Sequence, residues 1–324
     1  MPSALHRLLP LLLNYATLIL FALIVLTFSL LSPQFFSGQN LLNILVQASS
    51  LGIIATGMTF VLLTAGIDLS VGSIMFLAGV VSAQMVVSGQ PLWLAGLVVL
   101  LVGLVFGLVN AVLVFKVRIV PFIVTLATFY VGRGLGLFLS ETRAINLPES
   151  FLQIGAARLL GIPFPVLVLA GVVLVAHGVL TYTAFGRHIY AVGHSPEKAR
   201  KAGLPVNRIL LSVYLISGFC AALGGLVSIA QLGAVSPTFG YQSEFVAIAA
   251  AVLGGASLFG GKGTVLPGTL VGAVFIQALQ SGLVIINANP YLYPLITGGV
   301  IFLIVMIDSL RHRQQLRRRQ LGRA

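Results

Sequence analysis

Long apolar stretches, separated by short polar or glycine-rich breaks, run along nearly the whole chain. Stretches of about 20 apolar residues cross a bilayer as helices, and the alternating pattern of a membrane β-barrel is absent from this sequence. The pattern therefore predicts an all-α fold, a polytopic membrane helix bundle with about ten transmembrane helices. The predicted spans are residues 14–32, 41–63, 71–88, 92–115, 119–139, 164–182, 209–230, 244–258, 265–286 and 291–307. The eighth span is short enough to be a half-helix.

The composition indicates a membrane protein without a soluble domain. Hydrophobic residues make up 58% of the chain and charged residues only 7%, whereas soluble domains are roughly a quarter charged. So few charges could not cover the surface of a soluble fold of this length. We therefore interpret residues 1–324 as a single transmembrane domain, whose first span is not a cleaved signal peptide because no small-residue cleavage site follows it.

The distribution of Lys and Arg predicts an orientation. If the N-terminus is cytoplasmic and the spans alternate, fifteen basic residues face the cytoplasm, Arg143 and Arg158 face outside, and Arg133 lies within a span. The cytoplasmic set is Arg7, Lys116, Arg118, Arg187, Lys198, Arg200, Lys201, Arg208, Lys262, Arg311, Arg313, Arg317, Arg318, Arg319 and Arg323. Such a bias predicts an even number of spans with both termini cytoplasmic. The net charge of +12 then reflects topology and attraction of the basic tail 309–324 to anionic lipid, with no nucleic-acid partner.

The motif TAGIDLSVGS, residues 64–73, places one of only six acidic residues between two predicted spans. Gly66 and Gly72 weaken a helix, and Asp68 and Ser70 are good residues for the start of one. The motif therefore predicts a tight turn at the cytoplasmic side, in which Asp68 caps the next span or meets a basic group. Direct contact between Asp68 and a transported solute is the alternative interpretation.

A second break, GGASLFGGKGTVLPG, covers residues 254–268. Paired glycine-interrupted segments in two halves of a membrane chain are typical of internal repeats and transport pathways. The GGKGT portion is not a phosphate-binding loop, because that pattern needs Gly six residues before Lys262 and Ser or Thr directly after it. Those positions hold Ala256 and Gly263, so we do not expect this chain to bind ATP through such a loop.

The predicted cytoplasmic segment 183–208 contains the signals of a complete short helix. In chain order these are Ser195, Pro196, Glu197, Lys198, Arg200, Lys201, Gly203 and Pro205. They supply a cap, a first-turn proline, an acid at the positive end of the helix dipole, bases at the negative end, and a stop. A helix of about two turns is marginal alone. It is either an interfacial helix on lipid head groups or a docking lever for a cytoplasmic partner.

The fifth predicted span carries a stripe of small and polar residues. Thr125, Thr128, Gly132 and Gly136 fall on one side of a helix, with Arg133 near the edge of the stripe. Such a stripe faces protein or water rather than lipid, and a cation at that depth needs a cavity, an acid or carbonyl groups. The stripe either lines a translocation path or packs against another helix.

Three segments together resemble a known family. TAGIDLSVGS, the loop GRHIYAVGHSPEKARKAGL and the run AIAAAVLGGASLFGGKGTVLPGTLVGA (247–273) closely resemble permease subunits of bacterial ABC importers of the ribose/xylose/arabinose type. The resemblance covers about Asn40 to Asp308. One position departs from the family pattern, which usually reads Glu-Leu-Asp where this chain has Glu244-Phe245-Val246.

The resemblance implies a fold similar to the vitamin B12-type import permeases, in the bacterial inner membrane. It implies two permease subunits around a central path, cytoplasmic ATP-binding subunits, and a periplasmic sugar-binding protein. It also implies that residues 195–203 form the coupling helix, with Glu197, Ala199 and Gly203 at characteristic positions. ATP and Mg²⁺ then belong to the partner, and this chain binds no cofactor or metal and is no enzyme. The expected function is alternating-access import of a pentose, hexose or similar polyol.

Two other classes of function are weighed against this one. An ion-coupled carrier or channel needs a titratable group in the membrane interior, and most acids here lie near predicted span ends. A membrane enzyme lacks support, since the histidines show no metal spacing and no catalytic constellation stands out. The sequence leaves open which solute is carried, and whether the second permease is a copy of this chain or a related one.

Overall fold

A computed structural model describes residues 4–321, with side chains from residue 18 to residue 310. The chain is almost entirely helical, because its apolar runs must satisfy their backbone groups within each segment. The helices are α1 (Ala4–Leu31), α2 (Gly38–Leu63), α3 (Val71–Val87), α4 (Leu92–Phe115), α5 (Pro121–Leu139), α6 (Glu149–Ala156), α7 (Phe164–Tyr182), α8 (Ala184–His194), α9 (Pro196–Lys201), α10 (Val206–Leu232), α11 (Ser243–Leu253), α12 (Leu270–Ile285) and α13 (Leu292–Leu321). Short helical turns, η1 (Pro33–Phe36) and η2 (Val265–Thr269), precede α2 and α12.

Seven helical segments in the described part of the chain are long and apolar enough to cross a membrane. They are α2, α4, α5, α7, α10, η2 with α12, and residues 292–310 of α13. Three shorter apolar helices, residues 18–31 of α1, α3 and α11, lie on the remaining predicted spans. The chain is thus a multi-pass membrane protein. The predicted eighth span, 244–258, is helical only to Leu253, as the half-helix alternative expects.

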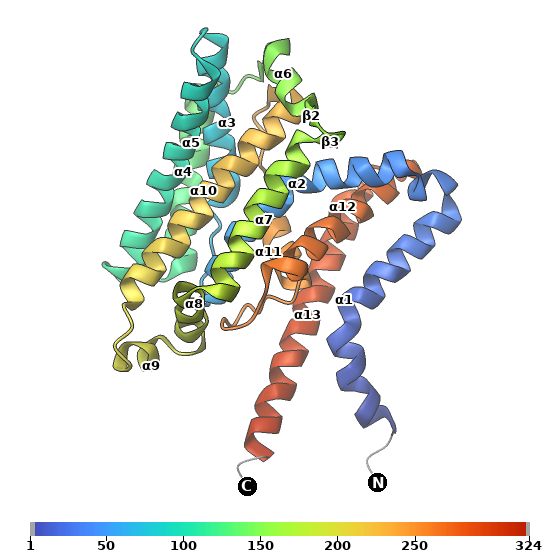
Figure 1. Cartoon of the computed structure of the whole chain (residues 1–324), viewed down its shortest axis with the longest axis vertical. Coiled ribbons are helices and arrows are strands. Elements are labelled where there is room, and N and C mark those ends of the chain that lie inside the picture. Colours follow the sequence, from blue (N-terminus) through green and yellow to red (C-terminus); the bar gives the residue numbers. More distant parts are fainter. Residues whose placement is uncertain (1–3, 322–324) are drawn as a thin grey trace.

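Two pairs of very short strands join loops at the ends of the helices. Strand β1 (Ile145–Asn146) pairs with β4 (Ala234–Val235), and β2 (Arg158–Leu159) pairs with β3 (Ile162–Pro163), both antiparallel. Helix α6 and the β2–β3 pair lie at one end of the bundle, and α8 and α9 lie at the other (Figure 1). The segments predicted outside and inside the membrane are therefore at opposite ends. Arg7 and residues 311–324 of the predicted basic tail lie outside the described side chains.

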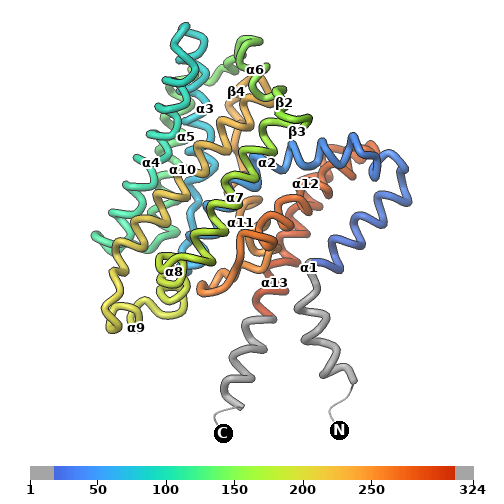
Figure 2. Tube along the Cα trace, viewed as in Figure 1, coloured from blue at the N-terminus to red at the C-terminus, as the bar shows by residue number. Residues whose placement is uncertain are grey.

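Helices α2 and α10 run through the middle of the bundle. Figure 2 shows α3, α4 and α5 on one side of α2, and α1, α12 and α13 on the other. Helices α4 and α10 cross closely because Gly103 faces Gly218, and a Cβ on either residue would overlap the other's carbonyl oxygen. Close approach of backbones at small residues is the usual packing device of membrane helices, since lipid tails give no hydrophobic drive for association.

Candidate functional site

The acid of the TAGIDLSVGS motif is buried inside the bundle. The motif leaves α2 at Leu63 and turns through Ala65, whose φ is +58°. The chain then re-enters the protein, so that Asp68 and Ser70 are both 0% exposed. The predicted tight turn is present, but its second half is a core segment rather than a surface loop.

Three hydroxyl and amide groups hold the Asp68 carboxylate. Oδ1 accepts hydrogen bonds from Ser70 N at 3.0 Å and Ser70 Oγ at 2.5 Å. Oδ2 accepts one from Ser217 Oγ, on α10, at 2.7 Å. Within the described residues Asp68 forms no ion pair. The bond to the Ser70 amide closes a turn within the motif rather than capping α3, whose N-cap residue is Ser70 and has no side-chain cap.

The network continues from Ser70 into two further helices. Asn110 on α4 donates its Nδ2 to Ser70 Oγ at 2.8 Å. Thr128 on α5 donates to Asn110 Oδ1 at 2.7 Å. The carboxylate, its hydroxyl partners and one amide therefore join α3, α4, α5 and α10. A buried polar network of this kind fixes the relative positions of the helices it joins, and both carboxylate oxygens of Asp68 are taken up by protein donors.

The stripe on α5 is a packing face. All four residues of the stripe, Thr125, Thr128, Gly132 and Gly136, are buried. A Cβ on Gly132 would lie 2.8 Å from Ser73 Oγ, and one on Gly136 would lie 2.5 Å from the Phe76 ring. The glycines are therefore needed where α3 crosses α5, which matches the helix-packing interpretation of the stripe.

Arg133 at the edge of that stripe binds a loop instead of packing. Its Nη1 donates to Phe239 O at 2.6 Å and its Nη2 to Pro237 O at 2.8 Å. The guanidinium also lies 4.4 Å from the centroid of the Phe76 ring and 5.7 Å from that of Tyr241. A cation within a span was expected to find carbonyl groups, and here these carbonyls belong to the loop that leads into α11.

Glu244, in the first turn of α11, is 4% exposed and touches the TAGIDLSVGS motif. Its Oε2 makes no hydrogen bond to any described residue. A Cβ on Gly72 would overlap that oxygen, so glycine is required at position 72 for a steric reason. Glu244, the first residue of the run that differs from the family pattern, thus packs directly against Gly72 near the start of α3.

The predicted cytoplasmic helix is present as α9, and it caps itself as expected. Ser195 Oγ accepts from Lys198 N at 3.3 Å, and Gly203 ends the helix with a φ of +80°. Ala199 is buried against the bundle, whereas the charged residues of α9 are exposed. The exposed ones are Glu197, Lys198, Arg200 and Lys201. Helix α9 therefore contacts the bundle through the small side chain of Ala199, and its charged side chains face away from the bundle.

Helix α8 connects α9 to the bundle. Near its end, Gly193 packs closely against the backbone of Leu63 and of the glycine-rich residues 260–263. A Cβ on Gly193 would overlap Leu63 O and lie 2.6 Å from Gly261 N. Gly261 N itself donates to Leu63 O at 2.9 Å. Tyr190 on α8 donates its hydroxyl to Gly263 O at 2.7 Å, and partial burial raises the pKa of this phenol, which keeps it a donor. We call this set of contacts the glycine junction.

The glycine junction joins three segments that are far apart in sequence. They are the end of α2, the end of α8, and the break that leads through η2 into α12. Gly260 and Gly261 have φ values of +79° and +70°, a left-handed conformation that only glycine adopts readily. The glycines of the GGKG run therefore allow the backbones of these segments to approach closely. This accounts for a glycine-rich sequence that resembles part of a phosphate-binding loop but lacks the rest of that pattern.

Four of the residues that make these contacts were not predicted from the sequence. Asn110 and Ser217 are polar groups within long apolar runs, which is itself a signal of function or tight packing in a membrane. Tyr190 and Gly193 carried no such signal, because their partners are backbone atoms of distant segments.

A profile of the family described as branched-chain amino acid transport system / permease component matches residues 40–305. Named relatives cover nearly the whole chain. The ribose import permease protein RbsC of Haemophilus influenzae is 41% identical over 299 residues, 91% of each chain. The D-allose transport system permease protein AlsC of Escherichia coli is 38% identical over 300 residues, 92% of each chain. The fructose import permease protein FrcC of Rhizobium meliloti is 36% identical over 303 residues, 89% of this chain and 84% of that one. No solved structure matches.

Proposed function

The chain belongs to this family of transport permeases, and from that premise we propose that it is the membrane permease subunit of an ATP-driven sugar importer. Its similarity to permeases named for ribose, allose and fructose supports a pentose or hexose as the solute. ATP hydrolysis takes place on a separate cytoplasmic subunit, and this chain supplies the path and the lever.

The observation that carries this proposal is the connection between α9 and the transport spans. A charged helix of about two turns is marginal alone, and its backbone connection to the bundle both stabilises it and gives force a route into the spans. Helix α8 passes directly from α9 into the glycine junction, where Gly193 and Tyr190 meet the end of α2 and the lead into α12. We propose that residues 195–203 dock on the ATP-binding subunit and that α8 transmits its movement.

The movement has a defined route within the chain. A shift of α8 displaces Leu63 and residues 260–263 together, because Gly261 N is bonded to Leu63 O. Leu63 is the last residue of α2 and directly precedes the TAGIDLSVGS turn, whose Asp68 network holds α3, α4, α5 and α10 as one group. We propose that this group and the α11–α13 group tilt against each other during alternating access. Asp68 then has a structural role and does not contact the solute.

The remaining assignments are part of the same proposal. The chain has ten spans in a vitamin B12-type arrangement, with both termini in the cytoplasm of a bacterial inner membrane. A periplasmic sugar-binding protein delivers the solute, and a second permease completes the path. Among the residues of the fifth span that were predicted to line the path, Thr125, Thr128 and Gly132 serve packing, and Arg133 borders the path by holding residues 237–239.

The proposal is tested by uptake into proteoliposomes that contain the complex purified from its native membranes. We expect radiolabelled D-ribose, D-allose or D-fructose to accumulate only with ATP on the cytoplasmic side and the binding protein on the other. Replacing residues 196–203 with a Gly-Ser linker should abolish uptake. Accumulation driven by an ion gradient without ATP would contradict the proposal and identify a secondary carrier.

A further inference from the structure

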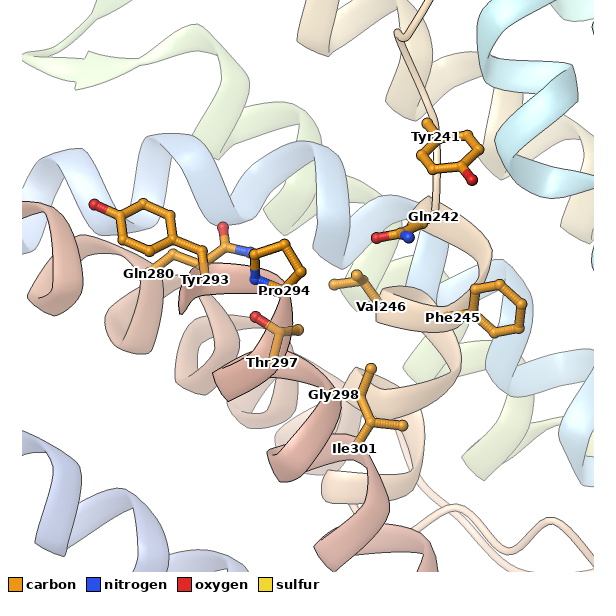
Figure 3. A pocket seen from close by; sticks show the side chains of 10 residues that line it. All are labelled: Tyr241, Gln242, Phe245, Val246, Gln280, Tyr293, Pro294, Thr297, Gly298 and Ile301. Atoms are coloured by element: carbon orange, nitrogen blue, oxygen red, sulfur yellow. The ribbon is translucent and has the colours of Figure 1, made fainter. Parts of the chain in front are cut away.

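A pocket of about 430 Å³ lies between the start of α11 and the helices α12 and α13. Figure 3 shows Gln242 and Val246 pointing from the start of α11 towards α13. The lining residues are Tyr241, Gln242, Phe245, Val246, Gln280, Tyr293, Pro294, Thr297, Gly298 and Ile301. The pocket therefore contains Val246, the position at which the chain departs from its family pattern.

The polar groups of this pocket are uncharged amides and hydroxyls that do not hydrogen-bond to one another or to the rest of the described chain. Two amides, Gln242 and Gln280, and three hydroxyls, Tyr241, Tyr293 and Thr297, line it. None of these five side chains makes a hydrogen bond to any residue that the structure describes. Amides and hydroxyls both donate and accept, so together they can bind several ligand hydroxyls in place of water.

The pocket's lining also excludes some ligands. It contains no Asp, Glu, Lys, Arg or His among the described residues, and a charged ligand group out of bulk water needs a charged or strongly polar counterpart. A zwitterionic amino acid would leave both its charges without a counter-ion there. By contrast, a pocket of about 410 Å³ between α2, α7 and α10 is lined almost wholly by apolar groups, as suits a lipid chain.

The wall that carries Gln242 is held in a costly conformation. Gln242 has a φ of +63°, a left-handed backbone that is unfavourable for a residue other than glycine. The preceding loop is fixed by the Arg133 bonds to Pro237 O and Phe239 O. Glu244, shortly after it, is wedged against Gly72. These contacts hold residues 241 and 242 at the pocket rim, which indicates a built site rather than a packing gap.

We propose that this pocket is a solute-contact site within the membrane, and that it takes a neutral polyol such as a free aldose or ketose. Gln242, Gln280 and Thr297 bind its hydroxyls, and Tyr293 packs against an apolar face of the sugar ring. Val246 offers no hydrogen bond, so it limits the number of hydroxyls held and contributes to solute preference. The site rests on the proposed function, and it goes beyond it by naming residues that touch the solute.

The first test separates transport from ATP hydrolysis in the reconstituted complex. Gln242→Leu and Thr297→Val remove hydrogen-bonding groups at nearly constant size, while Gln90→Leu and Thr181→Val make the same changes at exposed sites away from the pocket. We expect each pocket variant to lower sugar uptake about tenfold, with ATPase stimulation by the loaded binding protein unchanged, and each control to match wild type. Unchanged uptake in both pocket variants, or an equal fall in uptake and ATPase activity, would overturn the proposal.

A second test detects the ligand directly, with the sugar that the wild type imports as the probe. The native cysteine, Cys220, is buried, so in a Cys220→Ala background Gly298→Cys, at a lining position where a Cβ meets no atom within 4 Å, gives a selectively reactive thiol without removing a proposed sugar ligand. The sugar should slow labelling of this thiol by a soluble maleimide, and should leave labelling of Tyr291→Cys, at an 89% exposed position, unchanged. Equal labelling with and without sugar would contradict the proposed solute site and would leave the proposed importer function unaffected. Absence of ATP-driven sugar uptake by the wild type would instead defeat the proposed function.

Discussion

The substitution Gly193→Ala tests whether the glycine junction transmits movement from α9. The added methyl group would lie 2.6 Å from Gly261 N and would overlap Leu63 O. Ordinary contact needs roughly 3.5 Å between such atoms, so relief of the closer overlap, with Leu63 O, requires α8 to move away by about 1.5 Å or more. Overpacking of this kind costs about 1–3 kcal/mol. Weakening the bond from Gly261 N to Leu63 O adds about 1 kcal/mol.

The expected result is a separation of ATP hydrolysis from uptake. Helix α9 is unaltered, so the complex should still assemble and hydrolyse ATP. With the whole of this cost, about 2–4 kcal/mol, added to the barrier of the transport step, uptake falls roughly 30-fold or more. The control is Gly178→Ala on α7, where a Cβ meets no atom within 4 Å, and it should transport as wild type. Uptake by Gly193→Ala at the wild-type rate would refute the reasoning, and so would failure of that variant to assemble.

Three further substitutions test the buried contacts. Asp68→Ala removes the acceptor of the Ser70 and Ser217 hydroxyl protons, and we expect thermal unfolding in detergent to show a loss of about 2–4 kcal/mol; an unchanged melting temperature would contradict the network. Gly72→Ala should lower uptake at least tenfold, because its methyl group would overlap Glu244 Oε2 and lie 2.6 Å from the backbone oxygen of Gly240; wild-type uptake by this variant would exclude the steric explanation. Thr128→Val should lower stability by about 1 kcal/mol without changing uptake per assembled complex, whereas selective loss of uptake would return Thr128 to the path.

The positions of the helices could be predicted from the sequence because membrane spans depend on local composition. Hydropathy alone places α4 and α7 within a residue or two of their observed ends, since a lipid-facing helix is recognisable without knowing its neighbours. Helix α9 was also predictable, because its cap, charges and stop are all close together in the sequence. The short α11 was anticipated as a half-helix for the same reason.

The contacts that define the site were not predictable, because they join residues distant in sequence. Asp68 and Ser217 are 149 positions apart, and the residues around each of them do not indicate that the two side chains are in contact. The sequence therefore predicted only a tight turn at the cytoplasmic side, and gave no sign that its acid is buried. The stripe on α5 allowed two interpretations, because small residues are found both at helix-packing faces and along translocation paths. The packing face became visible only once α3 was placed against α5. The pocket near Val246 was not predictable either, since its lining combines residues just before α11 with neutral side chains of α11, α12 and α13, and the departure at Val246 does not reveal those neighbours.

The proposed coupling of this permease to a separate ATPase through residues 195–203 has a direct test. The tagged chain is purified from its native membranes in mild detergent, and the proteins that accompany it are identified. We expect an ATP-binding subunit in stoichiometric amount, and its loss when residues 196–203 are replaced with a Gly-Ser linker while the chain itself stays folded. Recovery of the chain alone, in several mild detergents and with nucleotide present, would contradict the coupling and indicate a self-sufficient carrier.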